Sequence, residues 1–182
     1  MEENLGDASI IPGYGDTMTA DSPWLTEQQQ RVWRGWLSTQ SRLPAALHRQ
    51  LQADSELSLP DYDVLVQLTD TPQARLRVSD LAGALDWERS RLSHHIKRMA
   101  GRGLVEREEC PDDGRGAFIV LTPAGRTAIE RAAPAHARTV RELVFDALSD
   151  EELDTLGGVI DKLVTRLDRP PARSPQRPPT GR

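Results

Sequence analysis

The sequence predicts a mainly α-helical fold with one short β-hairpin. Apolar residues recur every three or four positions over most of the chain, whereas segments 104–109 and 117–122 alternate in the manner of strands. A chain of 182 residues is long enough to bury a core, and no apolar run reaches the ~18 residues of a membrane span. The acidic start Met1-Glu2-Glu3 does not resemble a secretory signal, so we expect a cytoplasmic protein with no membrane partner.

The first periodic segment lies within 23–57. Thr26 and Gln29 have the spacing of a capping box, which predicts a helix start. Trp33, Leu37, Leu47 and Leu51 then follow at helical spacing. Because proline removes a backbone donor and clashes with the preceding turn, we expect a kink at Pro44.

Three shorter helices are predicted next. Ser58 and the following Pro60 mark the start of one, which ends before Thr71-Pro72. Apolar residues at spacings of three and four then predict two further helices. The first has two turns and carries Val78, Leu81, Ala82 and Leu85. The second is longer and carries Leu92, Ile96 and Met99. We expect Asp86 to cap the longer helix, and a tight turn between two such helices is a helix-turn-helix.

The two strands enclose the turn-rich loop 111–116, and a hairpin directly after a helix-turn-helix is a wing. Thr122-Pro123 opens a long helix that we expect to kink at Pro134, and Ser149 with Glu152 forms another capping box. Behind that box lies a seam spaced 3, 4, 3, 4, which suits pairing between helices: Leu153, Leu156, Ile160, Leu163 and Leu167.

The charge distribution points to nucleic acid. The net charge of −5 argues against phosphate binding, but segment 88–103 holds five cations and one anion, a local charge of +4. At 100° per residue its polar side chains gather opposite Leu92, Ile96 and Met99. We expect four residues near the helix start to read base edges in the major groove: Ser90, Arg91, Ser93 and His94. Lys97 and Arg98 lie further along the helix and are expected to clamp phosphates.

Two further candidate contacts are His95 and the tip of the wing. His95 is expected to pack or to touch a phosphate rather than to read a base. Arg115, between two glycines at the wing tip, is suited to enter a minor groove, with Asp113 bracing its guanidinium. The alternative for the polar face of segment 88–103 is an ordinary solvated helix face. The alternative for the wing is a hairpin turn with one exposed arginine.

The order of these helices, the Asp113-Gly114-Arg115 wing and the Leu121-Thr122-Pro123-Ala124-Gly125 helix start resemble the MarR family of bacterial regulators. The resemblance covers about residues 26–167. It implies a homodimer formed by the first helix and the last two, binding double-stranded DNA at a roughly palindromic promoter site, usually as a repressor. It also implies that Asp113 and Arg115 work at the minor groove and that Arg98 contacts the backbone. Family members often release DNA when a small aromatic or phenolic effector binds, and no effector-binding residue is carried over.

The expected organisation has five segments. They are a disordered arm (1–22), an N-terminal dimerisation helix kinked at Pro44 (23–57), a winged helix-turn-helix domain (58–122), C-terminal dimerisation helices (123–168) and a disordered tail rich in proline and arginine (169–182).

Other functions have weaker support in the sequence. A winged helix that binds an acidic protein partner is the main alternative. No nucleophile motif or phosphate-binding glycine loop indicates an enzyme or a cofactor, and the histidines lack the spacing of metal ligands. Cys110, the only cysteine, has acidic neighbours that disfavour a reactive thiolate, so we expect no redox role.

Overall fold

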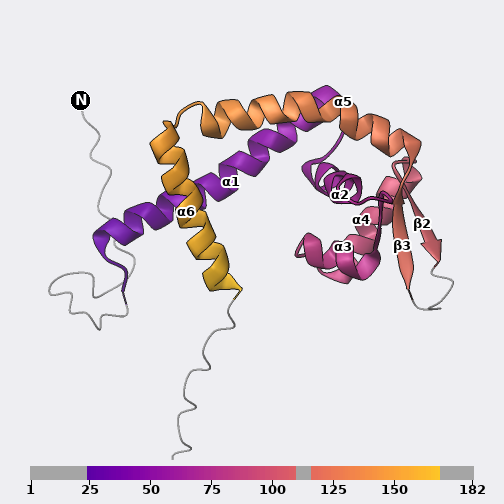
Figure 1. Ribbon diagram of the computed structural model, residues 1–182, viewed down its shortest axis with the longest axis horizontal. Coiled ribbons are helices and arrows are strands. Elements are labelled where there is room, and N and C mark those ends of the chain that lie inside the picture. The colour runs from indigo at the N-terminus through magenta and orange to yellow at the C-terminus, as the bar shows by residue number, and fades with distance from the viewer. Residues whose placement is uncertain (1–23, 110–115, 169–182) are drawn as a thin grey trace, which may run out of the picture. The chain divides into compact units, whose positions relative to one another are not determined.

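The computed structural model describes residues 24–109 and 116–168 (Figure 1). The helices are α1 (Glu27–Ser55), α2 (Leu59–Thr69), α3 (Val78–Ala84), α4 (Arg89–Gly101), α5 (Pro123–Val140), the π-helical segment η1 (Arg141–Phe145) and α6 (Asp150–Leu167). The strands are β1 (Arg75–Arg77), β2 (Val105–Glu109) and β3 (Ala117–Leu121). The chain divides within α1 into two units, residues up to 42 and residues from 43 onwards.

The described part of the first unit is the N-terminal portion of α1. Its predicted capping box is present: Thr26 Oγ1 accepts the Gln29 amide at 3.1 Å, and Gln29 Oε1 accepts the Thr26 amide at 2.8 Å. Trp33 and Leu37, which lie at helical spacing in the predicted dimerisation helix, are exposed. The helix continues without interruption past Pro44, in the second unit, and the kink there remains a prediction.

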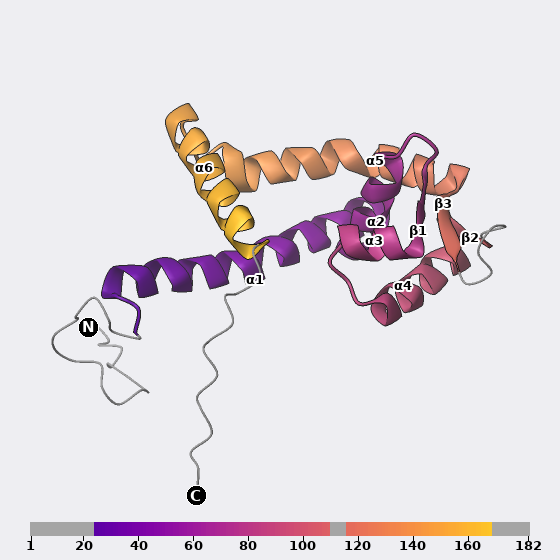
Figure 2. The same cartoon turned by 60° about the horizontal axis from the view of Figure 1, so that its bottom comes forward.

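In the second unit α3 and α4 form the predicted helix-turn-helix, and Figure 2 shows the short turn that joins them. The prediction that Asp86 caps α4 is wrong. The N-cap is Glu88, which makes no side-chain capping bond, and Asp86 lies earlier in the turn with a φ of 51°. Asp86 therefore serves to reverse the chain, because aspartate tolerates the left-handed region better than most residues do.

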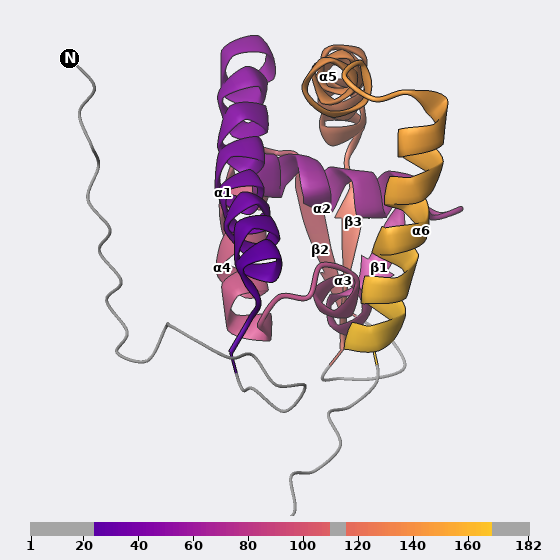
Figure 3. The ribbon, with the colours of Figure 1, turned by 90° about the vertical axis from the view of Figure 1, so that its left-hand side faces the viewer.

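The sheet has three strands in the order β1-β3-β2, all antiparallel. Figure 3 shows β2 beside β3. The hairpin of β2 and β3 is confirmed, with Val105 opposite Leu121 and Glu109 opposite Ala117. The sequence did not predict β1, which pairs Leu76 with Ile119. In β3 the residues at odd positions are buried and Phe118 and Val120 are half-buried, as the alternation predicts.

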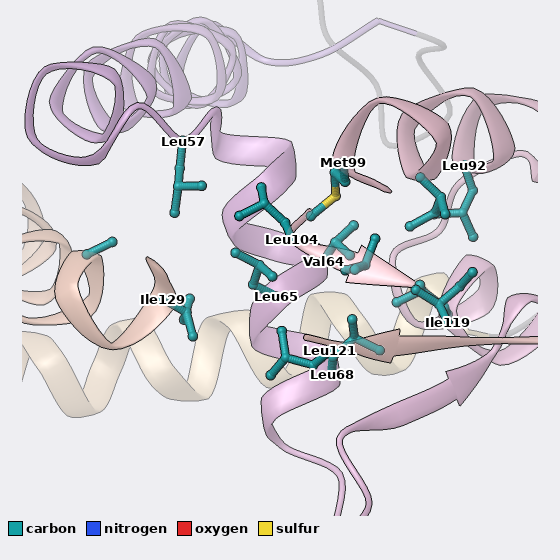
Figure 4. Close-up of a cluster of buried hydrophobic side chains, with 14 of the residues drawn as sticks. Leu57, Val64, Leu65, Leu68, Leu92, Met99, Leu104, Ile119, Leu121 and Ile129 are labelled. Carbon is teal, nitrogen blue, oxygen red and sulfur yellow. The ribbon is translucent and has the colours of Figure 1, made fainter. Parts of the chain in front are cut away.

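One apolar core joins these elements (Figure 4). Its members come from the end of α1, from α2, α3 and α4, from both hairpin strands and from the start of α5; they include Leu51, Leu65, Leu68, Leu81, Leu92, Met99, Ile119, Leu121 and Ile129. The predicted inner face of α4 is confirmed, because Leu92, Ile96 and Met99 are buried. The core thereby holds α4 by one face and leaves the other face to solvent.

The C-terminal helices begin at the predicted caps. Thr122 Oγ1 accepts the Gly125 amide at the start of α5, and Ser149 forms a capping box with Glu152 at the start of α6. Helix α5 contains Pro134 and passes into η1, which the sequence did not predict. The seam residues of α6 Leu153, Ile160, Leu163 and Leu167 are exposed. Within the described residues, no helix is both long and apolar enough to cross a membrane.

Candidate nucleic-acid interface

The outer face of α4 carries all six predicted reading and clamping residues of this helix. Each of them is exposed; they are Ser90, Arg91, Ser93, His94, Lys97 and Arg98. No acidic residue lies within α4. The structure thus presents a cationic, hydrogen-bonding surface about three turns long on a helix whose opposite side is anchored in the core.

Several of these side chains have intramolecular partners. The Ser93 hydroxyl donates to the Arg89 carbonyl oxygen at 2.8 Å, which leaves its oxygen free to accept. The Arg91 guanidinium lies over the indole of Trp87, with Cζ 4.4 Å from the ring centroid. Arg98 Nη2 lies 2.8 Å from His95 Nδ1. Arg91 and Arg98 are therefore partly ordered before any ligand binds.

His95 is buried, so it packs within the protein as the sequence analysis allowed. A guanidinium can only donate, so His95 Nδ1 accepts from Arg98 and the ring proton belongs on Nε2. That nitrogen lies 3.0 Å from Asp61 Oδ1, so the N–H side of the ring is next to the carboxylate. The imidazole thus connects an exposed arginine of α4 to a buried carboxylate of α2.

Asp61 is the centre of this buried network. It accepts from the Ser58 amide at 2.9 Å and from Arg102 Nη1 at 2.7 Å, and Arg102 Nη2 also donates to the Glu56 carbonyl at 2.7 Å. Burial alone would raise the pKa of the Asp61 carboxyl, but the close contact with His95 and the hydrogen bonds with Ser58 and Arg102 outweigh burial and hold the pKa well below its usual range. Asp61 is therefore ionised and ties the N-terminus of α2 to the C-terminus of α4.

Sequence reasoning missed the roles of Asp61, Trp87 and Arg102 in this surface. In the sequence, Asp61 stands out only as an acidic residue in the first turn of a predicted helix, and Arg102 only as one of the five cations in segment 88–103. No local pattern connects them, because the ion pair joins residues 41 positions apart.

The base of the wing carries a second basic cluster. The guanidinium carbons of Arg75 and Arg77 lie 4.5 Å and 5.3 Å from the ring centroid of Phe118. Arg75 also pairs with Glu108 of β2 at 3.8 Å. Asp113 and Arg115, predicted to act at the wing tip, lie outside the described residues, as does Cys110.

The wing joins α5 through Thr122 and Gly125. The Thr122 hydroxyl donates to the Gly103 carbonyl at 2.7 Å and accepts the Gly125 amide at 2.9 Å. A Cβ on Gly125 would overlap the Leu104 carbonyl oxygen. The Leu-Thr-x-x-Gly pattern therefore has a structural role, since it packs the start of α5 against the end of the helix-turn-helix.

A polar cluster lies where α1, α2 and α5 meet. The rings of Tyr62 and His136 are 4.2 Å apart, and His136 Nδ1 lies 3.3 Å from Gln50 Oε1. Burial lowers the pKa of His136, and burial together with Asp63 raises the pKa of Tyr62. Within the described residues, no three histidine, cysteine or acidic side chains gather as a metal site would require.

Comparison with known proteins agrees with this geometry. A family model described as MarR family matches residues 55–116, which include α2, α3, α4 and β2. The transcriptional regulator HosA of Escherichia coli O111:H- is 30% identical over 114 residues, 63% of this chain and 76% of that protein. Sco3205, a MarR family transcriptional regulator from Streptomyces coelicolor solved in complex with DNA, is 38% identical with a TM-score of 0.78, and the match covers 84% of this chain and 96% of that one. AbsC from the same organism is also 38% identical, with a TM-score of 0.76 and coverage of 81% and 99%.

Proposed function

Because the chain belongs to the MarR family of DNA-binding transcriptional regulators, we propose that it binds a pseudo-palindromic promoter site as a homodimer. In this proposal α4 enters the major groove and the wing reaches the adjacent minor groove. Members of the family regulate transcription and are not enzymes.

The observation that supports the proposal is the outer face of α4, whose charged side chains are all cationic. An α-helix fits the major groove of B-DNA, where arginine, lysine, serine and histidine side chains recognise base edges and phosphates. The remainder of the chain is acidic, because the whole chain has a net charge of −5 even though segment 88–103 contributes +4, and acidic surfaces disfavour indiscriminate binding to phosphate. Local cationic charge on an acidic protein therefore favours selective contact through α4.

The residue roles are those expected from the helix. Base readout is assigned to Ser90, Arg91, Ser93 and His94. Lys97 and Arg98 contact phosphates, and the Arg98 contact uses donors that its bond to His95 leaves free. Arg115, braced by Asp113, reads the minor groove; both residues lie outside the described part of the chain.

Dimerisation is supported by exposed apolar side chains. On α6 the exposed fractions of Leu153, Ile160 and Leu163 are 42%, 42% and 45%, and they share one face of the helix. Water contact with such a face is unfavourable, so pairing with a second copy stabilises it. A two-fold dimer would present two α4 helices to half-sites about one helical turn of DNA apart.

Fluorescence anisotropy with DNA from the promoter region next to its own gene tests the proposal. Wild type should bind this DNA in the presence of random-sequence competitor, and its affinity should fall steeply with salt because counterions are released. Arg91→Ala and Arg115→Ala should each cost about 1–3 kcal/mol of specific binding. Lys97→Ala should weaken binding to all sequences and reduce the salt slope by about 1.

Arg131→Ala is the matched control, since Arg131 is exposed on α5 away from the proposed interface. It should change neither the affinity nor the salt slope. Equal binding of promoter and random DNA would move the search for the operator to selection from a random pool. A failure to bind either DNA at low salt would favour the alternative, a winged helix that binds an acidic protein.

Repression and effector release are further parts of the proposal. Transcription in vitro from the bound promoter should decline as protein is added, and an increase would identify an activator. A panel of small aromatic and phenolic acids should include a compound that lowers anisotropy at fixed protein concentration. If no compound in the panel lowers the anisotropy, the result would contradict this class of effector.

A further inference from the structure

Trp87 lies in the turn of the helix-turn-helix, immediately before the N-cap of α4. Its backbone amide donates to the Ala82 carbonyl of α3 at 2.9 Å. Its indole is half-buried and packs against the apolar core. Backbone and side chain of Trp87 are therefore both held by the fold.

The indole meets two residues of α4 in different ways. The His95 ring stands edge-on to it, with centroids 5.3 Å apart and an interplanar angle of 89°. His95 is itself held by Asp61 and Arg98. The Arg91 guanidinium lies over the indole, 4.4 Å from the ring centroid. The fold therefore holds the indole in place, and the side chain of Arg91 packs on it.

This contact leaves the recognition chemistry of Arg91 intact. Stacking occupies the flat face of a guanidinium, whereas its N–H donors lie in the plane and point outwards along its edge. Among the described residues, the Arg91 guanidinium forms no hydrogen bond or ion pair, and Trp87 is the contact that restrains it. Recognition of guanine O6 and N7 needs two in-plane donors, so a stacked Arg91 keeps the donors that readout requires.

We infer that Trp87 is a positioning residue that holds Arg91 ready for base readout, an inference that rests on the proposed function of α4. A free arginine loses rotamer entropy when it binds, and a stacked arginine has lost part of that entropy already. Trp87 thereby increases affinity for the operator without contacting a base. Nonspecific binding, which depends on phosphate contacts, does not involve this restraint.

A double-mutant cycle tests the inference. Full-length wild type, Trp87→Leu and Trp87→Phe are compared, each with Arg91 or with Arg91→Ala, by anisotropy on operator and random DNA. Trp87→Leu removes the aromatic face and should weaken operator binding about two- to fivefold, as expected for an exposed cation–π contact. Random-DNA binding should stay unchanged, and Trp87→Phe should restore most of the loss. In the Arg91→Ala background, Trp87→Leu should have no further effect.

Leu85→Ala controls for a general loss of stability, since Leu85 is half-buried against the same core and closes α3. Thermal unfolding identifies variants of equal stability, and Leu85→Ala should bind operator as wild type does at temperatures where both are folded. NMR adds a readout in the free protein. The indole ring current should shift the Arg91 Nε–H resonance, and the shift should disappear in Trp87→Leu.

Three outcomes overturn the inference. Operator affinity can be unchanged in Trp87→Leu, the loss can be the same with and without Arg91, or Arg91→Ala can leave operator affinity intact. None of these outcomes contradicts promoter-specific binding by the protein, provided that wild type prefers promoter to random DNA; the third would remove only Arg91 from the residues assigned to base readout. Absence of that preference would instead overturn the proposed function itself.

Discussion

The Asp61 carboxylate at the N-terminus of α2 and the Arg102 guanidinium at the C-terminus of α4 form an ion pair, with 2.7 Å between Oδ2 and Nη1. The Asp61 side chain is 5% exposed, and that of Arg102 is 42% exposed. The pair joins α4, the helix proposed to enter the major groove, to α2. We expect it to contribute to the orientation of α4 as well as to stability.

Asp61→Asn should lower the free energy of unfolding at pH 7 by about 2 kcal/mol, because it removes the buried carboxylate that accepts hydrogen bonds from Arg102 and from the Ser58 amide. Urea unfolding followed by circular dichroism measures the change. Asp70→Asn is the control, because Asp70 is exposed at the end of α2. Equal stability of Asp61→Asn and wild type would show that the network is not needed for folding.

The pH dependence of stability should differ between Asp61 and Asp63. The folded pKa of Asp61 is depressed from 3.8, so its contribution is present above that value and is lost as pH falls through the folded pKa. The pKa of Asp63 is raised by burial, which His95 partly offsets, so ionised Asp63 opposes folding at neutral pH. Asp61→Asn should therefore destabilise and Asp63→Asn should stabilise at pH 7. Acid titrations of unfolding should show the Asp61 effect shrinking below about pH 4, and effects of the same sign would refute this assignment.

His136 should make stability fall as the solution is acidified towards pH 5. Burial lowers its pKa from 6.5, so the unfolded chain binds a proton more readily than the folded chain does below that value. His136→Gln should flatten the stability profile between pH 7.5 and about 5. His94→Gln, at an exposed position of α4, is the control and should retain the wild-type slope. The same slope in His136→Gln and wild type would contradict the prediction.

Gly125→Ala should destabilise the protein by about 1–3 kcal/mol, since overpacking forces backbone or side chains to move. The added Cβ would overlap the Leu104 carbonyl oxygen and press on the Leu121 side chain. Gly83→Ala is the matched control, because the space around Gly83 in α3 is open. It should raise stability by about 0.4–1 kcal/mol through a smaller unfolded-state entropy. Chemical denaturation of both variants checks the pair, and a tolerated Gly125→Ala would mean that α5 shifts freely.

Ile160→Glu should convert the proposed dimer to monomers. It places a charge in the exposed apolar seam of α6, where pairing with a second copy would bury it. Thr165→Glu adds the same charge on the opposite side of the helix and should leave the dimer intact. Sedimentation velocity of the two variants distinguishes these states. A dimeric Ile160→Glu protein would place the interface elsewhere.

The sequence by itself determined the local elements and the surface that is proposed to bind DNA. The capping boxes at Thr26, Ser58 and Ser149 are present because each depends on residues three positions apart. The outer face of α4 followed from helical periodicity, since a side chain's direction depends on its position along the helix. The hairpin of β2 and β3 followed from alternation and a turn-rich loop.

Only the tertiary structure decided which residues support that surface. The short strand β1 gave no periodic signal and forms because the outer edge of β3 is available to pair with it. Asp86 was misread because its left-handed backbone depends on how α3 and α4 pack, not on its capping propensity. Asp61 with Arg102, and Trp87 with Arg91 and His95, assemble through contacts that follow from packing. Sequence patterns predict the hydrogen bonds and burial of residues within one helix, turn or strand. Contacts between side chains of different elements depend on how these elements pack around the core.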